Sequence, residues 1–332
     1  MKKIFAKLMT LFVFLFSLSA CNFSIGVNYN YPDADKYVLG SSNLEGIETI
    51  NIDWISGKVI FVGHESGSIS TDSYFKEEYT QDLTDDYLLR YYKNGKELNI
   101  KFAKSGANLN NKNIEKTLKI YINKDDLIKR NILVNTISAD VNVGFADFND
   151  INIVTVSGDV NISKVNSPKV MLTTISGDVG VVELKSSYID VSTVSGDIDF
   201  KTLSNPTSSI ASMVNILSID KANISTISGD TEIRGYNIGD LEFNSTSGNL
   251  EYNFYGEYNF DIDINTVSGN IKFGFISLAS MIIEYDTTSG SFNSSFDVTI
   301  QNGKYIVKDG KNEVNVNTTS GNLTLDRVLL LD

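Results

Sequence analysis

The chain has 332 residues, 42% of them hydrophobic, with 41 acidic and 28 basic residues and a formal net charge of −13. This length allows one large domain or two ordinary ones. The excess of acid argues against a nucleic-acid partner and against polybasic attachment to anionic lipid. A single cysteine excludes an internal disulfide.

The first 20 residues have the pattern of a secretory signal peptide. Lys2, Lys3 and Lys7 precede an apolar run from Leu8 to Ala20. A charged start, a short apolar stretch and small residues at the end are typical of an exported leader. The run is shorter than the roughly 20 apolar residues of a membrane-spanning helix. We therefore expect residues 1–20 to be removed on export.

The leader ends in Leu18-Ser19-Ala20-Cys21, which resembles the bacterial lipobox. The resemblance implies cleavage between Ala20 and Cys21 and a lipid on the Cys21 sulfur. An ordinary signal peptide with a chance cysteine is the alternative. With a lipid anchor, residues 21–43 become the anchor and linker. The protein is then exported and held on the cell membrane or the outer membrane, at the surface or facing the periplasm.

Residues 44–130 carry short segments with strand periodicity. "IETINIDWISGKVIFVG" from Ile47 reads as strand, Ser-Gly turn and strand, while "ELNIKF" and "TLKIYI" are further alternating segments. The polar stretch 74–89, between them, is expected to be a protruding loop or hairpin. We interpret 44–130 as irregular coils that cap a larger stack, with a separate N-terminal β-domain as the alternative.

Residues 131–332 repeat one phrase, Thr or Ser, any residue, then Ser-Gly-Asp or a close variant. The repeats are spaced by 19 to 21 residues, except for two longer steps around residues 204–215 and 301–312. Those steps predict inserted loops or an extra strand. The serines of the phrase are Ser138, Ser157, Ser176, Ser195, Ser228, Ser247, Ser268, Ser289 and Ser320.

The positions six and four residues before each serine are apolar in all nine copies, and an apolar alternation mostly resumes after the phrase. A period of two indicates a strand with one face inward. One unit of about 19 residues cannot bury that face alone, whereas stacked units can. The sequence therefore predicts an all-β fold, a single-stranded parallel β-solenoid with coils of about 19–21 residues.

The repeated phrase, the opening segment from Ile47 and the ending "NEVNVNTTSGNLTL" resemble the bacterial DUF4097 putative-adhesin family from about Leu44 to Leu325. The resemblance implies a right-handed, β-helix-like solenoid. It also implies a lipid-anchored envelope protein that presents a binding or adhesion surface without catalysis. An envelope structural or stress-sensing scaffold that binds peptides or a membrane partner is the alternative.

We interpret the Ser-Gly-Asp phrase as a corner between two strands. Glycine is expected to supply a positive φ, Asp or Asn to bond its own turn, and serine to occupy the tight inside of the corner. The threonine two residues before the serine is expected, like the serine hydroxyl, to bond the next coil. The predicted structural turn residues are Gly158, Gly177, Gly196, Gly229, Gly248, Gly269, Gly290 and Gly321.

The residues of the corner also admit two chemical interpretations. Serine catalysis needs a base beside the nucleophile, and nine serines cannot share the one histidine, His64. Calcium could bind a row of stacked carboxylates, although the Gly-Asp-rich pattern of calcium β-rolls is missing. The carboxylates of that alternative are Asp140, Asp159, Asp178, Asp197 and Asp230.

We expect no cofactor and no enzyme activity, since the outward positions near the corners carry no basic cluster of the polysaccharide-lyase kind. The late aromatic residues mostly fall at core parity, but Tyr255 and Tyr258 do not and could stack on a glycan. The expected partners are the membrane, through the anchor, and a glycan, peptide or protein ligand that the sequence does not identify.

Overall fold

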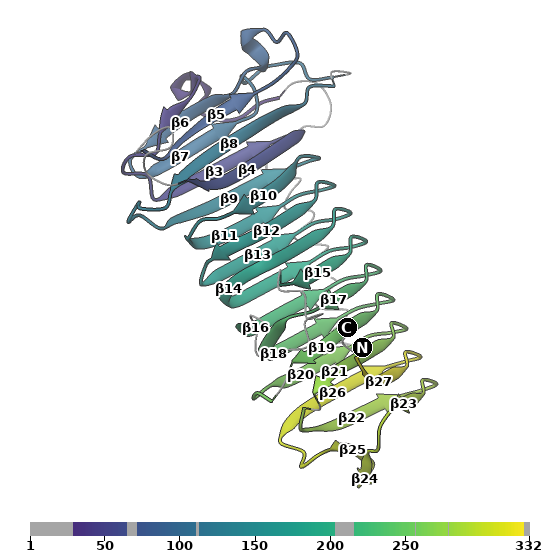
Figure 1. Ribbon diagram of the computed structural model, residues 1–332. Coiled ribbons are helices and arrows are strands. Elements are labelled where there is room, and N and C mark those ends of the chain that lie inside the picture. Colours follow the sequence, from purple (N-terminus) through teal and green to yellow (C-terminus); the bar gives the residue numbers. More distant parts are fainter. Residues whose placement is uncertain are drawn as a thin grey trace. The chain divides into compact units, whose positions relative to one another are not determined.

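A computed structural model describes residues 29–64, 72–110, 113–202, 216–255, 257–277 and 279–328 (Figure 1). The leader, Cys21 and the predicted insertion at 204–215 lie outside these residues. The chain divides into two compact units, residues 1–167 and 168–332. Apart from two short 3₁₀ helices, η1 (Ala34–Lys36) and η2 (Asp85–Tyr87), the described regular structure is all strand. Neither helix has the length and apolarity needed to cross a bilayer.

Each regular coil places one strand before its corner and one strand after it. Equivalent strands of neighbouring coils pair in parallel, as when Val141 aligns with Val160 and Ile189 aligns with Ala222. The strands before the corners form one sheet of a unit, the pre-corner sheet, and those after the corners form its post-corner sheet. The predicted parallel β-solenoid is thus confirmed for each unit.

The first unit contains the strands up to residue 167. They are β1 (Val38–Leu39), β2 (Ser42–Asn43), β3 (Thr49–Trp54), β4 (Gly57–His64), β5 (Tyr74–Glu78), β6 (Arg90–Asn94), β7 (Glu97–Lys101), β8 (Lys116–Asn123), β9 (Arg130–Thr136), β10 (Asp140–Gly144), β11 (Phe148–Val154) and β12 (Val160–Asn166).

The second unit contains the remaining strands. They are β13 (Lys169–Thr173), β14 (Val179–Ser192), β15 (Ile198–Lys201), β16 (Leu217–Ser225), β17 (Thr231–Ile233), β18 (Tyr236–Asn244), β19 (Leu250–Tyr255), β20 (Asp261–Asn265), β21 (Ile271–Ser277), β22 (Met281–Thr287), β23 (Phe292–Ser294), β24 (Thr299–Gln301), β25 (Lys304–Val307), β26 (Asn312–Thr318) and β27 (Leu323–Arg327).

The core of each unit is built from the alternating apolar positions that the sequence shows. In β9, for example, Ile132 and Val134 are buried while Leu133 between them is 38% exposed. Full burial of one such aliphatic side chain contributes about 1.5–3 kcal/mol. Because the inward columns continue from coil to coil, each coil buries the apolar face of its neighbour, as expected for a repeat fold.

The coils at the start of the first unit do not stack in chain order. β3 pairs in parallel with both β7 and β9, and β4 pairs in parallel with both β8 and β10. The coil of residues 49–64 therefore lies between the coil that contains β7 and β8 and the coil that contains β9 and β10. This arrangement could not be seen in the repeat spacing, which records only the order along the chain.

The outer end of the first unit is closed by antiparallel strands. β5 pairs with β8 and β6 pairs with β7, and the short strands β2 and β1 pair with β5 and β6. The stretch 74–89 was expected to protrude as a loop or hairpin, and this is wrong for residues 74–78, which form β5 in the post-corner sheet. The reversal of strand direction ends the parallel stack.

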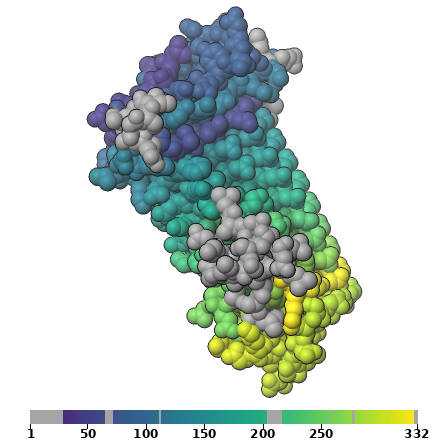
Figure 2. All heavy atoms as spheres, in the orientation of Figure 1, coloured from purple at the N-terminus to yellow at the C-terminus, as the bar shows by residue number. Residues whose placement is uncertain are grey.

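The last coil of the second unit is inserted between two earlier ones (Figures 1 and 2). β26 pairs in parallel with β20 and β22, and β27 pairs in parallel with β21 and β23. In the space-filling view its yellow atoms lie against the green residues of earlier coils and above the yellow-green residues that precede it in the chain. The coil nearest the end of the sequence is therefore internal.

The predicted insertion at 301–312 adds strands. β25 pairs antiparallel with β22 on one side and with β24 on the other. The turn between β24 and β25 is Asn302-Gly303, with φ of 52° and 77°. Two consecutive positive φ values are the geometry of a two-residue type I′ hairpin, which favours Asn-Gly. The hairpin extends the pre-corner sheet beyond the last parallel strand.

The inserted coil makes a prediction for amide exchange. The amides of residues 313–317 in β26 should exchange at least about 100-fold more slowly than those of 299–301 in β24, because β26 has a strand on each side and opens only with its neighbours. Hydrogen–deuterium exchange measured by mass spectrometry checks this. Fast exchange in β26, as expected of a terminal strand, would contradict the stacking order described here.

Candidate functional site

The corner glycines lie where successive coils approach most closely. A Cβ atom at Gly196 would lie 1.9 Å from the carbonyl oxygen of Gly177, and one at Gly229 would lie 1.9 Å from that of Gly196. Real Cβ atoms do not approach a backbone oxygen this closely. The same contact, at 2.0–2.1 Å, recurs at Gly158, Gly248, Gly269, Gly290 and Gly321.

The physical reason expected for these glycines is therefore wrong. None of the eight predicted turn glycines has a positive φ. The Ser-Gly turn of the first coil is different, since Gly57 has a φ of +87° and also lies against the backbone of Lys116. In the regular corners, glycine is required because the backbone of the neighbouring coil occupies the space of a side chain, and not because of its own torsion angles.

The serine of the phrase bonds a neighbouring coil as expected, although it does not lie on the inside of the corner, and the threonine mainly bonds its own corner. Ser195 is exposed, and its hydroxyl donates to the Ile175 carbonyl at 3.4 Å. Thr193 is buried, and its hydroxyl accepts a hydrogen bond of 3.0 Å from the Gly196 amide of its own corner. The threonine thus satisfies a buried backbone donor, which is costly to leave unpaired. Contact with a neighbouring coil is made by the serine and, between Thr136 Oγ1 and Thr155 Oγ1 at 2.8 Å, by the threonine column as well.

The acidic column forms a ladder between coils instead of bonding its own turn. Asp178 Oδ1 accepts the Asp197 amide at 2.8 Å, and Asp197 Oδ1 accepts the Asp230 amide at 2.8 Å. Asparagine continues the ladder, since Asn249 donates both its amide and its Nδ2 group to Asp230 Oδ1, at 2.8 and 2.9 Å. The side-chain oxygen at this position therefore accepts a backbone N–H of the neighbouring corner, whether the residue is an aspartate or an asparagine.

The ladder bears on the calcium alternative. One oxygen of Asp140, of Asp178, of Asp197 and of Asp230 already accepts an N–H from the neighbouring corner. No group of three or more metal-ligating side chains converges anywhere in the described residues. The corner aspartates therefore have a structural role that needs no ion.

A hollow of about 640 Å³ lies beside the ladder on the outer face of the post-corner sheet of the second unit. Its floor is a row of side chains from four neighbouring strands, because β15, β17, β19 and β21 pair in parallel and in register. The polar side chains that line it are Asp197, Asp199, Asp230, Glu232, Asn249, Glu251, Asn270 and Lys272.

The charges of the hollow are unevenly balanced. Its lining has five carboxylates and the ammonium group of Lys272, which lies 3.1 Å from Glu251. Lys201 and Arg234 lie 2.7 and 2.8 Å from Asp199 and Glu232, so the excess negative charge belongs to Asp197 and Asp230. Burial raises the pKa of Glu232, and the nearby carboxylates of Glu251 and Asp199 add to this against the effect of Arg234. The hollow can thus hold a polar ligand and favours one that carries positive charge.

The aromatic residues of the second unit form a core cluster. Tyr252 and Phe254 are fully buried and stack at 4.5 Å. Tyr258 packs against Phe260 at 5.0 Å, and its hydroxyl lies 2.5 Å from that of Tyr252. Tyr258 is half-buried and packs on this cluster with one side of its ring, so its stacking on a glycan stays a prediction. Tyr255 is also half-buried.

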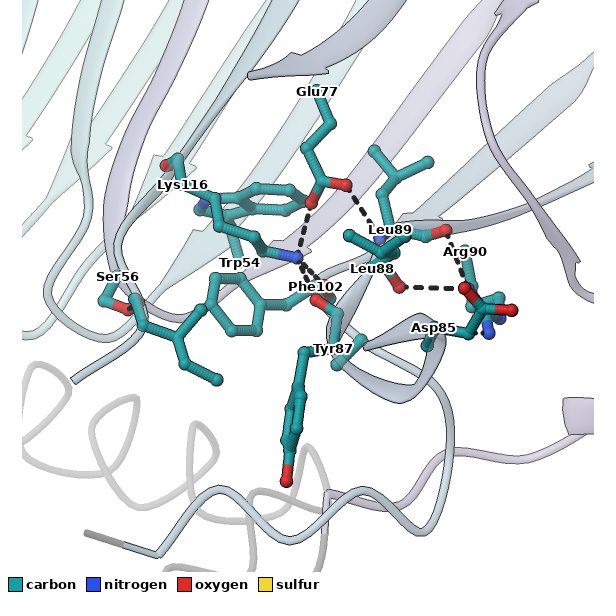
Figure 3. Close-up of polar contacts among 12 residues, drawn as sticks. Trp54, Ser56, Glu77, Asp85, Tyr87, Leu88, Leu89, Arg90, Phe102 and Lys116 are labelled. Atoms are coloured by element: carbon teal, nitrogen blue, oxygen red, sulfur yellow. Dashed lines mark hydrogen bonds and ion pairs between the residues drawn. The ribbon is translucent and has the colours of Figure 1, made fainter. Parts of the chain in front are cut away.

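The first unit contains a buried ammonium group that sequence reasoning missed (Figure 3). The side chain of Lys116 is fully buried, and its Nζ lies 2.5 Å from Glu77 Oε1. Nζ also donates to the Tyr87 carbonyl at 2.7 Å and to the Phe102 carbonyl. It lies over the rings of Phe102 and Trp54, with centroid distances of 4.1 and 4.9 Å. Cation–π contacts of this kind are strongest where water is excluded.

This environment makes Lys116 a structural residue. Its three N–H donors are taken by one carboxylate and two carbonyls, which leaves none for a substrate. Burial lowers its pKa to about 8, against the opposing charge of Glu77. The signal was present in the sequence, because Lys116 stands in the inward column that continues with Leu118 and Ile120. A lysine in that column needs a buried partner, but no sequence pattern indicates that the partner is Glu77.

A comparison with protein families identifies the family of the chain. The family model described as Toastrack DUF4097 matches residues 48–215 and 213–326. No curated protein matches the chain.

Several solved structures resemble it at low identity. A "putative lipid binding protein" from Parabacteroides distasonis ATCC 8503 is 15% identical, with a TM-score of 0.44 over 87% of this chain and 96% of its own. A "putative adhesin" from Bacteroides fragilis NCTC 9343 is 12% identical, with a TM-score of 0.36 over 88% and 97%. A "putative cell adhesion protein" from Clostridium sporogenes ATCC 15579 is 12% identical, with a TM-score of 0.22 over 88% and 99%.

The close contact of the corner predicts an order of mutational effects. Gly196→Ala should lower the free energy of unfolding by about 2–4 kcal/mol, because its Cβ collides with the Gly177 carbonyl. Ser195→Ala should cost about 0.5–1 kcal/mol, and Asp197→Asn no more than about 0.5 kcal/mol. Urea unfolding followed by circular dichroism measures all three.

Gly106→Ala is the matched control for the torsion angle. Gly106 has a φ of +91° and open space around its Cα, so the substitution changes only backbone strain. It should cost about 1 kcal/mol. A Gly196→Ala variant that loses no more stability than Gly106→Ala would show that coil contact does not determine the corner.

The buried ammonium group predicts a pH dependence of stability. Between pH 8 and 10.5, the ordinary pKa of a lysine, the unfolded chain holds the Lys116 proton and the folded chain has lost it. The free energy of unfolding should therefore rise with pH in this window, by up to about 3 kcal/mol. Lys116→Met should remove this rise, as measured by urea unfolding between about pH 7 and 9.5, below tyrosine ionisation.

Lys119→Met provides the control from the same strand. Lys119 lies on the outer side of β8, is 30% exposed and pairs with Glu78 at 2.6 Å. Its substitution should leave the pH profile unchanged. If the two variants gave the same profile as the unmodified protein, the depressed pKa of Lys116 would be disproved.

Proposed function

Because the chain belongs to the Toastrack DUF4097 family, we propose that it is a lipid-anchored protein of the cell envelope that binds a ligand on the outer face of its solenoid and performs no catalysis. The observation that carries the binding role is the hollow of about 640 Å³ beside the corner ladder. The anchor rests on the sequence Leu18-Ser19-Ala20-Cys21.

The hollow supports binding of a polar ligand with cationic groups. Three of its carboxylates, Asp199, Glu232 and Glu251, follow one another on adjacent strands, which are about 4.8 Å apart. Each of the three has a basic partner at 2.7–3.1 Å, so a cationic ligand would add to the charge of Asp197 and Asp230, which lie beside this row. The ladder beside the row fixes its spacing, because each corner is hydrogen-bonded to the next.

The corner residues support a role without catalysis. The hydroxyls of Ser138 and Ser157 donate to the carbonyls of Ile55 and Ile137. A nucleophilic serine would instead donate to a general base. His64 lies on β4, with its ring against Tyr74 and Tyr121. The repeated Ser-Gly-Asp phrase therefore belongs to the architecture of the solenoid.

Substitution of Cys21 tests the proposed lipid anchor. Cys21→Ser removes the sulfur that would carry the lipid, so the variant should lose the incorporation of a labelled fatty-acid analogue and appear as a precursor or a released protein. Metabolic labelling followed by cell fractionation measures both effects. Equal labelling of the variant and the unmodified protein would disprove the anchor.

The hollow is tested by removing charge without changing shape. Asp197→Asn combined with Asp230→Asn keeps the ladder, because Asn249 already occupies the same column. The double variant should bind a short oligolysine peptide about two- to thirty-fold more weakly, with the loss decreasing as salt is added. Isothermal titration calorimetry on the soluble chain, beside an uncharged glucan oligosaccharide, measures this.

Asp261→Asn combined with Asp263→Asn is the matched control. It removes the same charge from exposed positions of β20, on the outer face of the pre-corner sheet of the same unit. This variant should bind oligolysine as the unmodified protein does. An equal loss in both variants would indicate attraction by net charge alone and would contradict a specific site at the hollow.

A further inference from the structure

A patch of tyrosine and aliphatic side chains lies at the start of the described chain, in the first unit. Tyr31 packs on Tyr37 at 4.8 Å, and Tyr37 packs on Tyr92 at 5.6 Å. Val38 and Leu39 follow directly and are 50% and 46% exposed. We call these five residues the tyrosine patch. Among the exposed large apolar side chains of the described residues, only Val38 and Leu39 are adjacent in the sequence.

The tyrosine patch lies at an edge of its sheet. Among the described residues, β1, which consists of Val38 and Leu39, pairs only with β6. The order of strands from this edge inward is β1, β6, β7 and β3. Exposed aliphatic residues on an edge strand are normally avoided in soluble proteins, because they invite contact with another surface.

The proposed anchor places a lipid bilayer close to this patch. Eight residue steps separate Cys21 from Tyr29, the first described residue. A fully extended chain of that length spans at most about 28 Å. Tyr29 pairs with Ala107 and its hydroxyl accepts the Phe102 amide at 3.2 Å, so this tether is attached firmly to the first unit.

The chemistry of the patch suits the interface of a bilayer. Tyrosine has an apolar ring and a polar hydroxyl, and it favours the level of the lipid headgroups. Lys36 lies 5.8 Å above the Tyr92 ring and 3.1 Å from Asp33, and its long, exposed side chain can exchange that partner for a phosphate. Segments 29–43 and 90–94 together contain three basic and two acidic residues, in a chain whose net charge is −13. These two segments by themselves therefore do not repel an anionic surface.

We propose that the tyrosine patch lies on the bilayer that holds the anchor, with Val38 and Leu39 at the boundary between headgroups and acyl chains. The inference rests on the proposed anchor at Cys21. It adds that the first unit is fixed against the membrane at β1 and does not move freely on its tether. The occupant of the edge of β1 is thus a lipid surface, and not a second copy of the chain.

Spin labels on the lipidated protein test this contact. Leu39→Cys and, as the control, Ile300→Cys each introduce one free thiol, since the sulfur of Cys21 carries the lipid. Ile300 is another exposed aliphatic residue. It lies on the edge strand β24 of the second unit, and it is 65% exposed. Both proteins are reconstituted in vesicles of phosphatidylethanolamine and phosphatidylglycerol, and the labels are compared by electron paramagnetic resonance.

The expected result is a loss of collision with a water-soluble nickel complex and a gain of collision with oxygen at the Leu39 label. The Ile300 label should keep the accessibility that it has in the soluble Cys21→Ser background. Circular dichroism on both labelled proteins confirms that they are folded. Equal accessibility of the two labels in vesicles would overturn the proposal, as would dipolar broadening between Leu39 labels, which indicates pairing of two copies at β1.

The two proposals fail in different ways. If the protein does not sediment with vesicles and its Cys21 thiol reacts with a maleimide, the anchor itself is wrong. If it sediments with vesicles while the Leu39 label stays fully accessible to the nickel complex, the anchor stands and the docking of the tyrosine patch is wrong.

Discussion

The structure depends on how closely successive coils approach at their corners. A carbonyl oxygen of one coil occupies the space where a Cβ of the next would lie, at 1.9–2.1 Å in the regular repeats. This contact requires glycine and sets the distance at which the flanking strands can pair. The apolar columns then align, and the serine and Asp or Asn side chains bond from coil to coil because their atoms are brought into register. The threonine protects the buried amide that this tight turn creates.

The terminal coils of the two units need a cover that the regular coils receive from their neighbours. A parallel stack leaves unpaired strands and an open core at each end. At the start of the first unit the stack is closed by antiparallel strands, and at the end of the second unit by the β24–β25 hairpin. Placing the last coil between two earlier ones also ties the end of the chain into the sheet. Such non-local pairing is expected to slow folding.

The inside and the outside of the solenoid are specialised differently. Charged groups that enter the core at the start of the first unit are paired with an opposite charge, as for Lys116 with Glu77 and for Arg130 with Asp126 at 2.6 Å. The outer face of the second unit instead keeps carboxylates accessible beside a hollow. A fold of this kind offers regular rows of side chains and not a closed pocket around a reacting group. This geometry supports the proposed binding of an extended ligand.

The sequence by itself determined the repeat, the strand periodicity, the inward columns and the positions of the corners. These follow from local rules, because side-chain alternation and glycine placement are decided within one coil. Only the tertiary structure decided why glycine is needed, since the obstructing atom belongs to a neighbouring coil. It also decided the order of the terminal coils, the partner of Lys116 and the hollow beside Glu232. Each of these is a contact between segments far apart in the chain, and one sequence carries no record of which distant residues meet.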